Sequence, residues 1–171
     1  MAKLALGNPT EIMQKDFFKA LIVEFICTFL FVFTAVASVM TTSYDIPVQT
    51  LGSGIDCMQG ALMEATLTFS LLFTVYGTML DPGRKIPVGL GPFLVGLVVG
   101  ANTLAGGTFT GASMNPARSF GPAFVSWDWT NHWVYWVGPL VGGGVSGYVY
   151  ENFFIDRPSD HVPLPREEES F

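Results

Sequence analysis

Charge is scarce in this sequence. Only 13% of its 171 residues are Asp, Glu, Lys or Arg, and 50% are hydrophobic. Soluble domains carry about 25% charged residues. This composition, with a mean hydropathy of +0.44, therefore excludes an ordinary soluble domain and indicates a membrane protein. Nothing in the charge pattern suggests nucleic acid as a partner.

Cysteine is rarer still. The chain has two, Cys27 and Cys57, and a pair at this spacing forms neither a disulfide framework nor a metal-ligand motif. We expect no metal site and no cofactor. No nucleophile, base and orienting group lie together in the sequence, which disfavours an enzyme or a proton-coupled transporter.

Long apolar segments are what the sequence does have. Four of them approach the ~20 residues that a helix needs to cross a ~30 Å hydrocarbon core. They cover residues 17–40, 58–80, 88–107 and 133–155. A fifth, 116–125, is half as long. We therefore predict an all-α integral membrane protein with four transmembrane helices and one re-entrant half-helix. The first apolar run exceeds the ~7–15 residues of a cleavable signal, so it is expected to stay in the protein.

Lysine and arginine fall almost entirely on one side of this arrangement. They precede the first span, join the second to the third and follow the fourth, and only Arg118 falls on the other side. Because cytoplasmic loops carry the positive excess, we expect both termini in the cytoplasm. The predicted parts are a cytoplasmic N-terminus (1–16), a transmembrane domain (17–155) and a disordered cytoplasmic tail (156–171) without periodicity.

The first two spans contain an internal repeat. ALIVEFICTFLFVFT and GALMEATLTFSLLFT superpose with a shift of 40 residues, giving E-x-x-x-T-F-x-x-x-F-T twice, with Glu24 on Glu64 and Thr28 on Thr68. Consecutive spans run antiparallel, so the two copies are inverted, as in many transport proteins. Chance similarity between apolar helices is the alternative, and the matched glutamate argues against it.

A glutamate inside a span costs at least ~2.5 kcal/mol near the centre and needs a partner. Glu24 and Glu64 could accept hydrogen bonds from unpaired backbone amides, or could belong to a proton relay. We favour the structural role, because neither span has a second titratable group at helical spacing.

The segment GASMNPARSFGPA (111–123) supplies a backbone that needs such acceptors. Asn115 is suited to cap a helix and Pro116 to begin it. A helix over 116–125 would be ~15 Å long, so its start would lie near the membrane midplane. With the Asn115 oxygen in the cap, its NH2 group faces the cavity as a donor. The helix terminus and Arg118 add positive potential, which suits water and disfavours cations.

GASMNPARSFGPA, together with VVGANTLAGG and MEATLTFSLLFTVYGT, resembles the second half of an aquaporin of the major intrinsic protein family, in the plant tonoplast intrinsic subfamily. ALIVEFICTFLFVF resembles the first helix of the same proteins. In that family six spanning helices and two half-helices, each opening with Asn-Pro-Ala, form one water pore per subunit, and the subunits assemble as tetramers.

The resemblance implies roles for particular positions. The second Asn-Pro-Ala signature of the pore is matched by Asn115, Pro116 and Ala117. The selectivity filter is matched by Arg118, Ala112 and Thr103, where the subfamily more often has an aliphatic residue than threonine. The buried carboxylates that hold the half-helix loops are matched by Glu24 and Glu64.

The chain departs from the family between its first and second spans. The family's second helix, first Asn-Pro-Ala half-helix and third helix are missing at a junction near Met40 to Tyr44. Loss of two spans leaves the later spans oriented as before. A pore with fewer helices would leave Asn115 and Arg118 in need of new partners, and Glu24 without its loop.

We expect a passive channel for water, with small neutral solutes such as glycerol, urea or ammonia as further candidates. The alternative is a non-conducting truncated subunit that associates with full-length aquaporins. The expected partners are the lipid bilayer and other subunits, as a tetramer by resemblance. The vacuolar membrane, or tonoplast, is the location that the resemblance implies.

Overall fold

The computed structural model describes residues 15–43, 46–83, 86–87 and 89–155, and within these residues it is helical with no strand. The expected tail, Arg84, Lys85 and most of the expected N-terminal segment lie outside the described residues. The helices are α1 (Lys15–Ser43), α2 (Cys57–Val75), α3 (Leu90–Thr110), α4 (Pro116–Ser126) and α5 (Val134–Phe153). One π-helical segment, Tyr76–Leu80, extends α2. This confirms the all-helical fold class.

The helix ends follow from local sequence signals. Asp56 caps α2, its carboxylate accepting from Met58 N and Gln59 N at 2.8 Å each, while Gln59 accepts from Asp56 N at 3.1 Å. This reciprocal pair is a capping box. α3 runs to Thr110, three residues beyond the apolar segment seen in the sequence, because Gly111 ends it in the left-handed conformation with φ 79°.

The exposed surface of these helices is apolar. The helices Cys57–Leu80 and Leu90–Thr110 are long and apolar enough to cross a membrane, and only 28% and 17% of their most apolar windows are buried. Large apolar side chains such as Phe25, Leu104 and Leu140 are exposed. A core helix of a soluble protein would bury most of such surface. The arrangement therefore fits helices that face lipid.

α2 and α5 pack closely because glycine allows their backbones to approach. A Cβ on Gly142 would lie 2.0 Å from the carbonyl oxygen of Ala65, and one on Gly138 would lie 2.8 Å from that of Ala61. Small residues four apart in a helix allow membrane helices to approach closely in this way. The comparable pair on α3, Gly96 and Gly100, meets nothing within 4 Å.

Polar side chains link α2 to α3. Asn102 donates to the backbone oxygen of Leu67 at 2.9 Å, and the Ser70 hydroxyl donates to Asn102 Oδ1 at 3.1 Å. Hydrogen bonds of this kind hold membrane helices together where apolar contact alone does not favour association. α2, α3 and α5 thus form one packed group.

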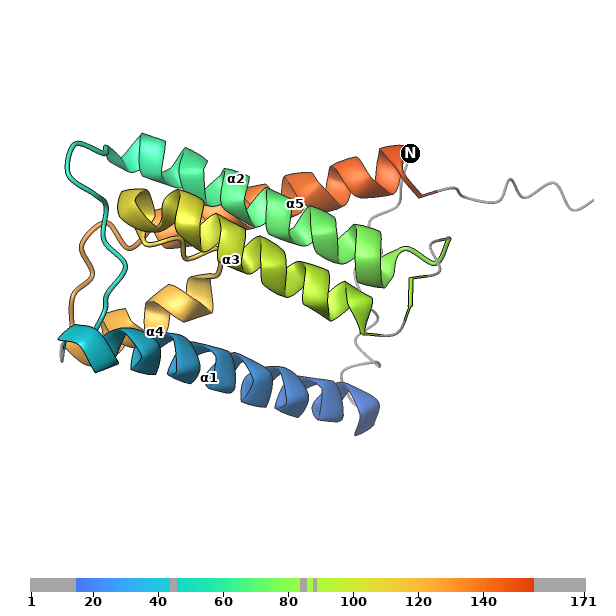
Figure 1. Ribbon diagram of the computed structural model, residues 1–171, viewed down its shortest axis with the longest axis horizontal. Helices are drawn as coiled ribbons and strands as arrows, with labels where there is room; N and C mark the ends of the chain where they lie inside the picture. Colours follow the sequence, from blue (N-terminus) through green and yellow to red (C-terminus); the bar gives the residue numbers. More distant parts are fainter. Residues whose placement is uncertain (1–14, 44–45, 84–85, 88, 156–171) are drawn as a thin grey trace, which may run out of the picture.

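α1 lies apart from this group and contacts α4. Figure 1 shows that α1 and α2 run in opposite directions, and that the start of α1 lies at the same end of the molecule as the end of α5. The repeat-related rings stack in both copies, Phe29 on Phe33 with centroids 6.1 Å apart and Phe69 on Phe73 with centroids 5.5 Å apart. The inverted repeat is therefore visible in local structure as well as in sequence.

Candidate functional site

The site is built around the start of the short helix α4. Figure 1 shows α4 beginning in the interior and returning to the end of the molecule where α3 finishes. Asn115 has extended backbone torsion angles, and its Oδ1 accepts from Ala117 N at 2.8 Å, while Pro116 is the first helical residue. This is the arrangement that suits an asparagine cap and a proline at the first position. With 11 residues, α4 is ~16 Å long.

The turn before α4 is strained and is held by a single carboxylate. Gly111, Ala112 and Met114 all have positive φ, at 79°, 48° and 56°, and for a residue other than glycine this costs of order 1–3 kcal/mol. The fully buried Glu64 accepts from Ser113 N at 2.8 Å and from Met114 N at 2.7 Å. These bonds satisfy amides that the turn leaves without helical partners.

Thr110 adds a third donor to the same carboxylate. Its hydroxyl donates to Glu64 Oε1 at 2.6 Å, and its backbone oxygen accepts from the Tyr135 hydroxyl at 3.0 Å. All three residues are buried. Glu64 therefore ties α2 to the end of α3 and to the turn before α4 by accepting three hydrogen bonds.

Glu24, the repeat partner of Glu64, is in a different environment. It is exposed on α1, and within the described residues its carboxylate accepts only from the Thr28 hydroxyl one turn later, at 3.3 Å. The two copies of the repeat thus differ: the carboxylate of Glu64 is buried and fully bonded, whereas that of Glu24 is exposed.

Arg118 joins the turn, α4 and α1. Its Nη1 donates to the backbone oxygen of Ala112 at 2.5 Å and to that of Ser113 at 3.4 Å. The guanidinium carbon lies 5.9 Å from the centroid of the Phe31 ring on α1, within the range of a cation–π contact. Its Nε is buried with no protein partner among the described residues.

The structure brings two of the expected filter residues into contact. Arg118 contacts the backbone of Ala112, which is fully buried. Thr103 is exposed on α3, and its hydroxyl donates to Val99 O at 2.8 Å, within its own helix. That bond occupies the hydroxyl proton, so Thr103 offers a molecule beside it mainly lone pairs.

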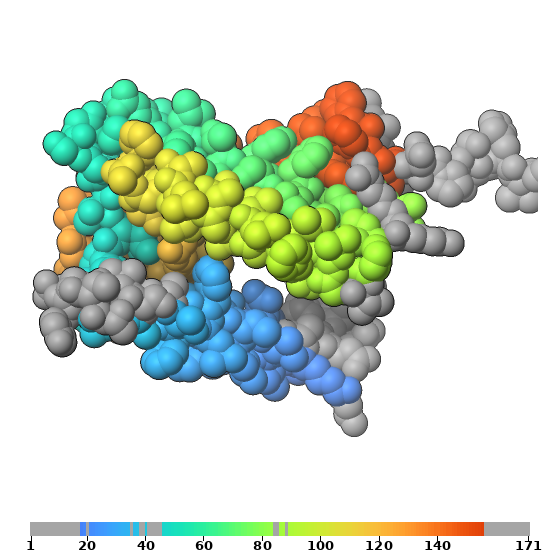
Figure 2. Space-filling model, viewed as in Figure 1, coloured from blue at the N-terminus to red at the C-terminus, as the bar shows by residue number. Residues whose placement is uncertain are grey.

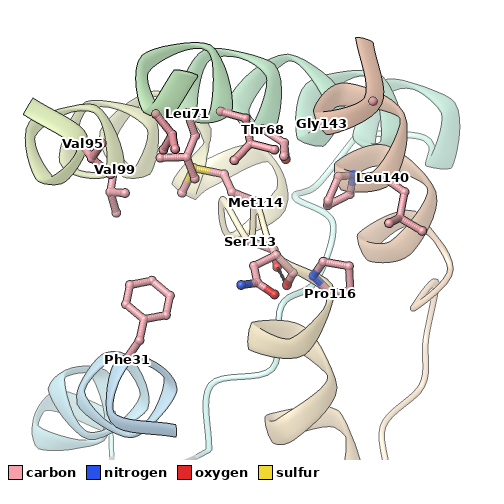
Figure 3. Close-up of a pocket in the computed structure, with 15 residues that line it drawn as sticks. Phe31, Thr68, Leu71, Val95, Val99, Ser113, Met114, Pro116, Leu140 and Gly143 are labelled. Atoms are coloured by element: carbon pink, nitrogen blue, oxygen red, sulfur yellow. Dashed lines mark hydrogen bonds between the residues drawn. The ribbon is translucent and has the colours of Figure 1, made fainter. Parts of the chain in front are cut away.

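A cavity of about 600 Å³ lies beside the start of α4. Figure 3 shows Phe31 on α1 facing Thr68 and Leu71 on α2 across this cavity, with Ser113 and Pro116 at its edge. Asn115 lines it as well. Figure 2 shows the surface hollowed between the blue α1 and the yellow-green α3. The lining is largely apolar, with Thr68, Ser113 and Asn115 as its polar side chains.

Two residues of the site were missed by sequence reasoning. Phe31 lies seven residues after Glu24, hence on the same face of α1, and this spacing could have identified it. Gln49 packs against Gly111, where a Cβ would lie 3.2 Å from Gln49 Cγ, and its Oε1 is buried without a partner among the described residues. No sequence signal indicates Gln49, because loop residues carry no periodicity.

Comparison with known proteins places this site in a family. The family model described as "Major intrinsic protein" matches residues 42–150. The chain is 42% identical to "Aquaporin TIP4-1" of Arabidopsis thaliana in an alignment over 247 residues, which covers 99% of this chain and 98% of the relative. It is 60% identical to "Aquaporin TIP4-4" of Zea mays over 126 residues, covering 74% of this chain and 49% of the relative.

A third relative, "Probable aquaporin TIP4-1" of Oryza sativa subsp. japonica, is 60% identical over 125 residues, covering 73% of this chain and 49% of the relative. The chain thus spans about half the length of the Zea mays and Oryza sativa relatives. The Arabidopsis thaliana alignment is longer than the 171-residue chain although it covers nearly all of both proteins. That relative therefore has an internal segment with no counterpart here. Since the family model matches most of the chain, the chain belongs to the major intrinsic protein family, whose members are membrane channels and not enzymes.

Proposed function

We propose that this chain forms part of a passive channel for water and small neutral solutes. The observation that carries the proposal is the start of α4, which opens on the cavity with Asn115 at its edge. The Asn115 oxygen is occupied by Ala117 N, whereas its amide NH2 makes no hydrogen bond within the described residues. The NH2 group is therefore available as a donor to a molecule in the cavity.

The electrostatics of this end of α4 favour a neutral solute. The helix terminus carries roughly half a positive charge, and Arg118 adds a full charge beside it. Both repel cations, while the Asn115 NH2 group can donate a hydrogen bond to a neutral molecule that offers a lone pair. We assign Asn115, Pro116 and Ala117 to the pore signature on this basis. We assign Arg118, Ala112 and Thr103 to the selectivity filter.

Glu64 has a supporting role in this proposal. Its bonds to Ser113 and Met114 fix the turn that aims Asn115 at the cavity. Among the described residues its bonded neighbours are two backbone amides and one hydroxyl, none of which titrates near neutral pH. A structural carboxylate is therefore favoured over a relay.

Stopped-flow light scattering on proteoliposomes tests the channel. Vesicles containing the full chain are expected to shrink faster than empty vesicles under an osmotic gradient, with a lower activation energy. The Asn115→Asp variant, which keeps the cap oxygen and removes the NH2 donor, is expected to shrink more slowly. Equal rates for the chain and for empty vesicles contradict conduction by this chain alone.

A non-conducting subunit is the second candidate function. The observation in its favour is that the relative from Arabidopsis thaliana carries an internal segment that this chain lacks, so the cavity has fewer walls here. Such a subunit is expected to co-purify with a full-length relative and to lower its water flux. Co-purification with unchanged flux argues against it.

The membrane and the assembly belong to the same proposal. The relatives are TIP aquaporins by name, and we place the chain in the vacuolar membrane with its termini in the cytoplasm. The start of α1 and the end of α5 lie at the same end of the molecule, which supports termini on one side. A tetramer is the assembly that the family resemblance suggests.

A further inference from the structure

A second cavity, of about 420 Å³, lies between α1 and α4 and shares no lining residue with the one beside Asn115. One of its walls is α4, through Gly121, Pro122 and Val125. The other wall is one face of α1, with the side chains of Phe29, Val32, Phe33, Val36, Ala37 and Met40. Every described residue that lines this α1–α4 groove is apolar, so no described side chain offers a hydrogen bond to an occupant.

The α1–α4 groove is long and narrow. Phe29 and Met40 are separated on α1 by about 16 Å along the helix axis. Over that length, a volume of 420 Å³ corresponds to an average width of about 6 Å. The two walls approach each other at Gly121, where a Cβ would lie 3.5 Å from Val32 Cγ1. Figure 1 shows the end of α4 beside the second half of α1.

This shape and lining select the kind of molecule that can occupy the groove. A buried water needs two to four polar partners, and the described lining has none. An irregular polypeptide segment would bring backbone N–H and C=O groups that also need partners. A helix is about 10–12 Å across, which is too wide. A hydrocarbon chain is about 4–5 Å across, as carbon contact distances of ~3.5–4 Å require, and it needs no hydrogen bond.

The groove is open to the surrounding bilayer. Phe33 and Val125, one from each wall, are 61% and 68% exposed, so a lipid chain can enter from the side. Met40 lies one turn before the end of α1, and Figure 1 shows the ends of α1 and α4 opposite the start of α1. The exposed Trp127 and Trp129 follow α4 directly, as is typical of a membrane interface. The groove therefore extends inward from the membrane surface, as an acyl chain does.

The charges at this end of the molecule disfavour an anionic lipid head. The described carboxylates there are those of Asp56 and Asp128. A hydrogen bond from the Thr130 backbone N–H lowers the pKa of Asp128, so its carboxylate is ionised at neutral pH. The described arginine nearest this end, Arg118, donates instead to backbone oxygens of the turn before α4. A lipid head without net charge avoids repulsion by the two carboxylates.

We propose that the α1–α4 groove binds one acyl chain of a membrane lipid whose head carries no net charge, in the leaflet opposite the start of α1. The chain packs between Phe33 and Val125 and extends toward Phe29. α4 is the only described helix that α1 packs against, so the bound chain fills the one described joint between α1 and the rest of the fold. This site is separate from the cavity at Asn115 and does not depend on channel function.

Photolabelling in nanodiscs tests the site. The full chain is placed in phosphatidylcholine nanodiscs with a small fraction of a phosphatidylcholine that carries a diazirine on one acyl chain, and adducts are mapped by mass spectrometry. Adducts per residue at Val32, Val36 and Pro122 are expected to exceed those at Leu104 at least about fivefold, because a held chain keeps close contacts. Leu104 is 87% exposed on α3 and reports lipid that is not held. Adducts that follow exposure alone overturn the proposal.

Two variants fill the groove, one from each wall. Ala37→Phe and Gly121→Leu are each expected to lower the adducts at Val36 to the level at Leu104. The matched control is Ala101→Phe, an exposed position of α3 that lines neither cavity, and its adducts should equal those of the unmodified chain. Circular dichroism verifies that the helices of each variant remain formed. Unchanged groove labelling in both filled variants overturns the proposal.

Two further arms identify the occupant. A phosphatidylglycerol with the same diazirine chain is expected to label the groove less than the phosphatidylcholine does, and equal or stronger labelling overturns the choice of an uncharged head. A second copy of the chain is tested with two differently tagged forms in one nanodisc. Crosslinks between the copies at Val36, without lipid adducts there, overturn the proposal because the groove is then covered by protein.

Discussion

The backbone N–H of Met114 donates to Glu64 Oε2 across 2.7 Å, although 50 positions of sequence separate the two residues. This bond and its neighbour at Ser113 join α2 to the turn before α4. These bonds offset the backbone strain at Ala112 and Met114, which both have positive φ. The strained turn in return directs both amides toward one carboxylate. The position of the Asn115 NH2 group, the donor at the cavity, therefore depends on Glu64, a residue of another helix.

Replacement of Glu64 by alanine is expected to destabilise the fold. It leaves two backbone amides and the Thr110 hydroxyl without acceptors, at about 1–3 kcal/mol for each buried unpaired donor. We expect a loss of at least about 3 kcal/mol, measured as a lower midpoint of thermal unfolding in detergent, together with lost water permeability.

Glu24→Ala is the matched control for Glu64. The substitution is identical and falls on the equivalent repeat position, but the Glu24 carboxylate accepts only the Thr28 hydroxyl among the described residues. Its unfolding midpoint in the isolated chain is expected to stay close to that of the unmodified protein. Equal losses for both variants would contradict the special role of Glu64.

Two substitutions of Asn115 separate the role of its side-chain oxygen, which caps α4, from the role of its NH2 group as a hydrogen-bond donor. Asn115→Ala removes the oxygen that accepts from Ala117 N and is expected to cost about 1 kcal/mol of stability. Asn115→Asp keeps the oxygen and should leave the unfolding midpoint nearly unchanged. Both remove the NH2 donor and are expected to slow water flux in stopped-flow measurements. Water flux through Asn115→Asp as fast as through the unmodified protein would argue against the amide as a solute contact.

Gly142 is expected to tolerate no side chain. A Cβ there would lie 2.0 Å from the Ala65 carbonyl oxygen, so α5 would have to move away from α2. Gly142→Ala is expected to lose about 1–3 kcal/mol or more. Gly144→Ala, on the same helix with nothing within 4 Å, should be neutral or slightly stabilising. The unfolding midpoints of the two variants are compared by thermal unfolding. Equal midpoints would contradict the expected loss at Gly142.

His132 is expected to make stability depend on pH. Burial lowers its pKa, and its ring lies 5.0 Å from that of Trp129. Below the ordinary histidine pKa of about 6.5, the unfolded chain binds a proton that the folded chain resists. Stability is therefore expected to fall as the pH falls.

The His132→Phe variant provides the comparison. Its unfolding midpoint should decrease less than that of the unmodified protein between about pH 7.5 and about pH 5. His161, in the tail, is present in both proteins, so it does not affect the difference. The same decrease in both would show that His132 does not titrate differently on folding.

Several parts of the fold could be predicted because their causes are local. Asn115 and Pro116 begin α4 where a cap followed by proline predicts a start. Each apolar segment coincides with an observed helix, α2 being taken with its π-helical extension, to within about three residues at either end, since about 20 apolar residues satisfy their backbone only as a helix in lipid. α3 ends three residues later than the apolar segment predicts, because the glycines at 106 and 107 resemble a helix stop that is in fact at Gly111.

The contacts of the site could not be predicted in the same way. The partner of Arg118 on α1, Phe31, and the packing of Gln49 on Gly111 join residues that are distant in sequence. Thr103 matches a filter position by resemblance, although an aliphatic residue is more common there, and its hydroxyl is bonded within α3. Side-chain direction at such positions depends on how the helices pack.

The sequence by itself determined the helices, the half-length of α4 and the repeated E-x-x-x-T-F pattern, because each depends on residues within a few turns of one another. Only the tertiary structure decided that Glu64 is buried and fully bonded while Glu24, in the same local sequence, is exposed. The physical reason is that a carboxylate in a membrane helix is satisfied by donors from other segments. Those donors reach Glu64 from the end of α3 and from the turn before α4, and no other described segment brings them to Glu24.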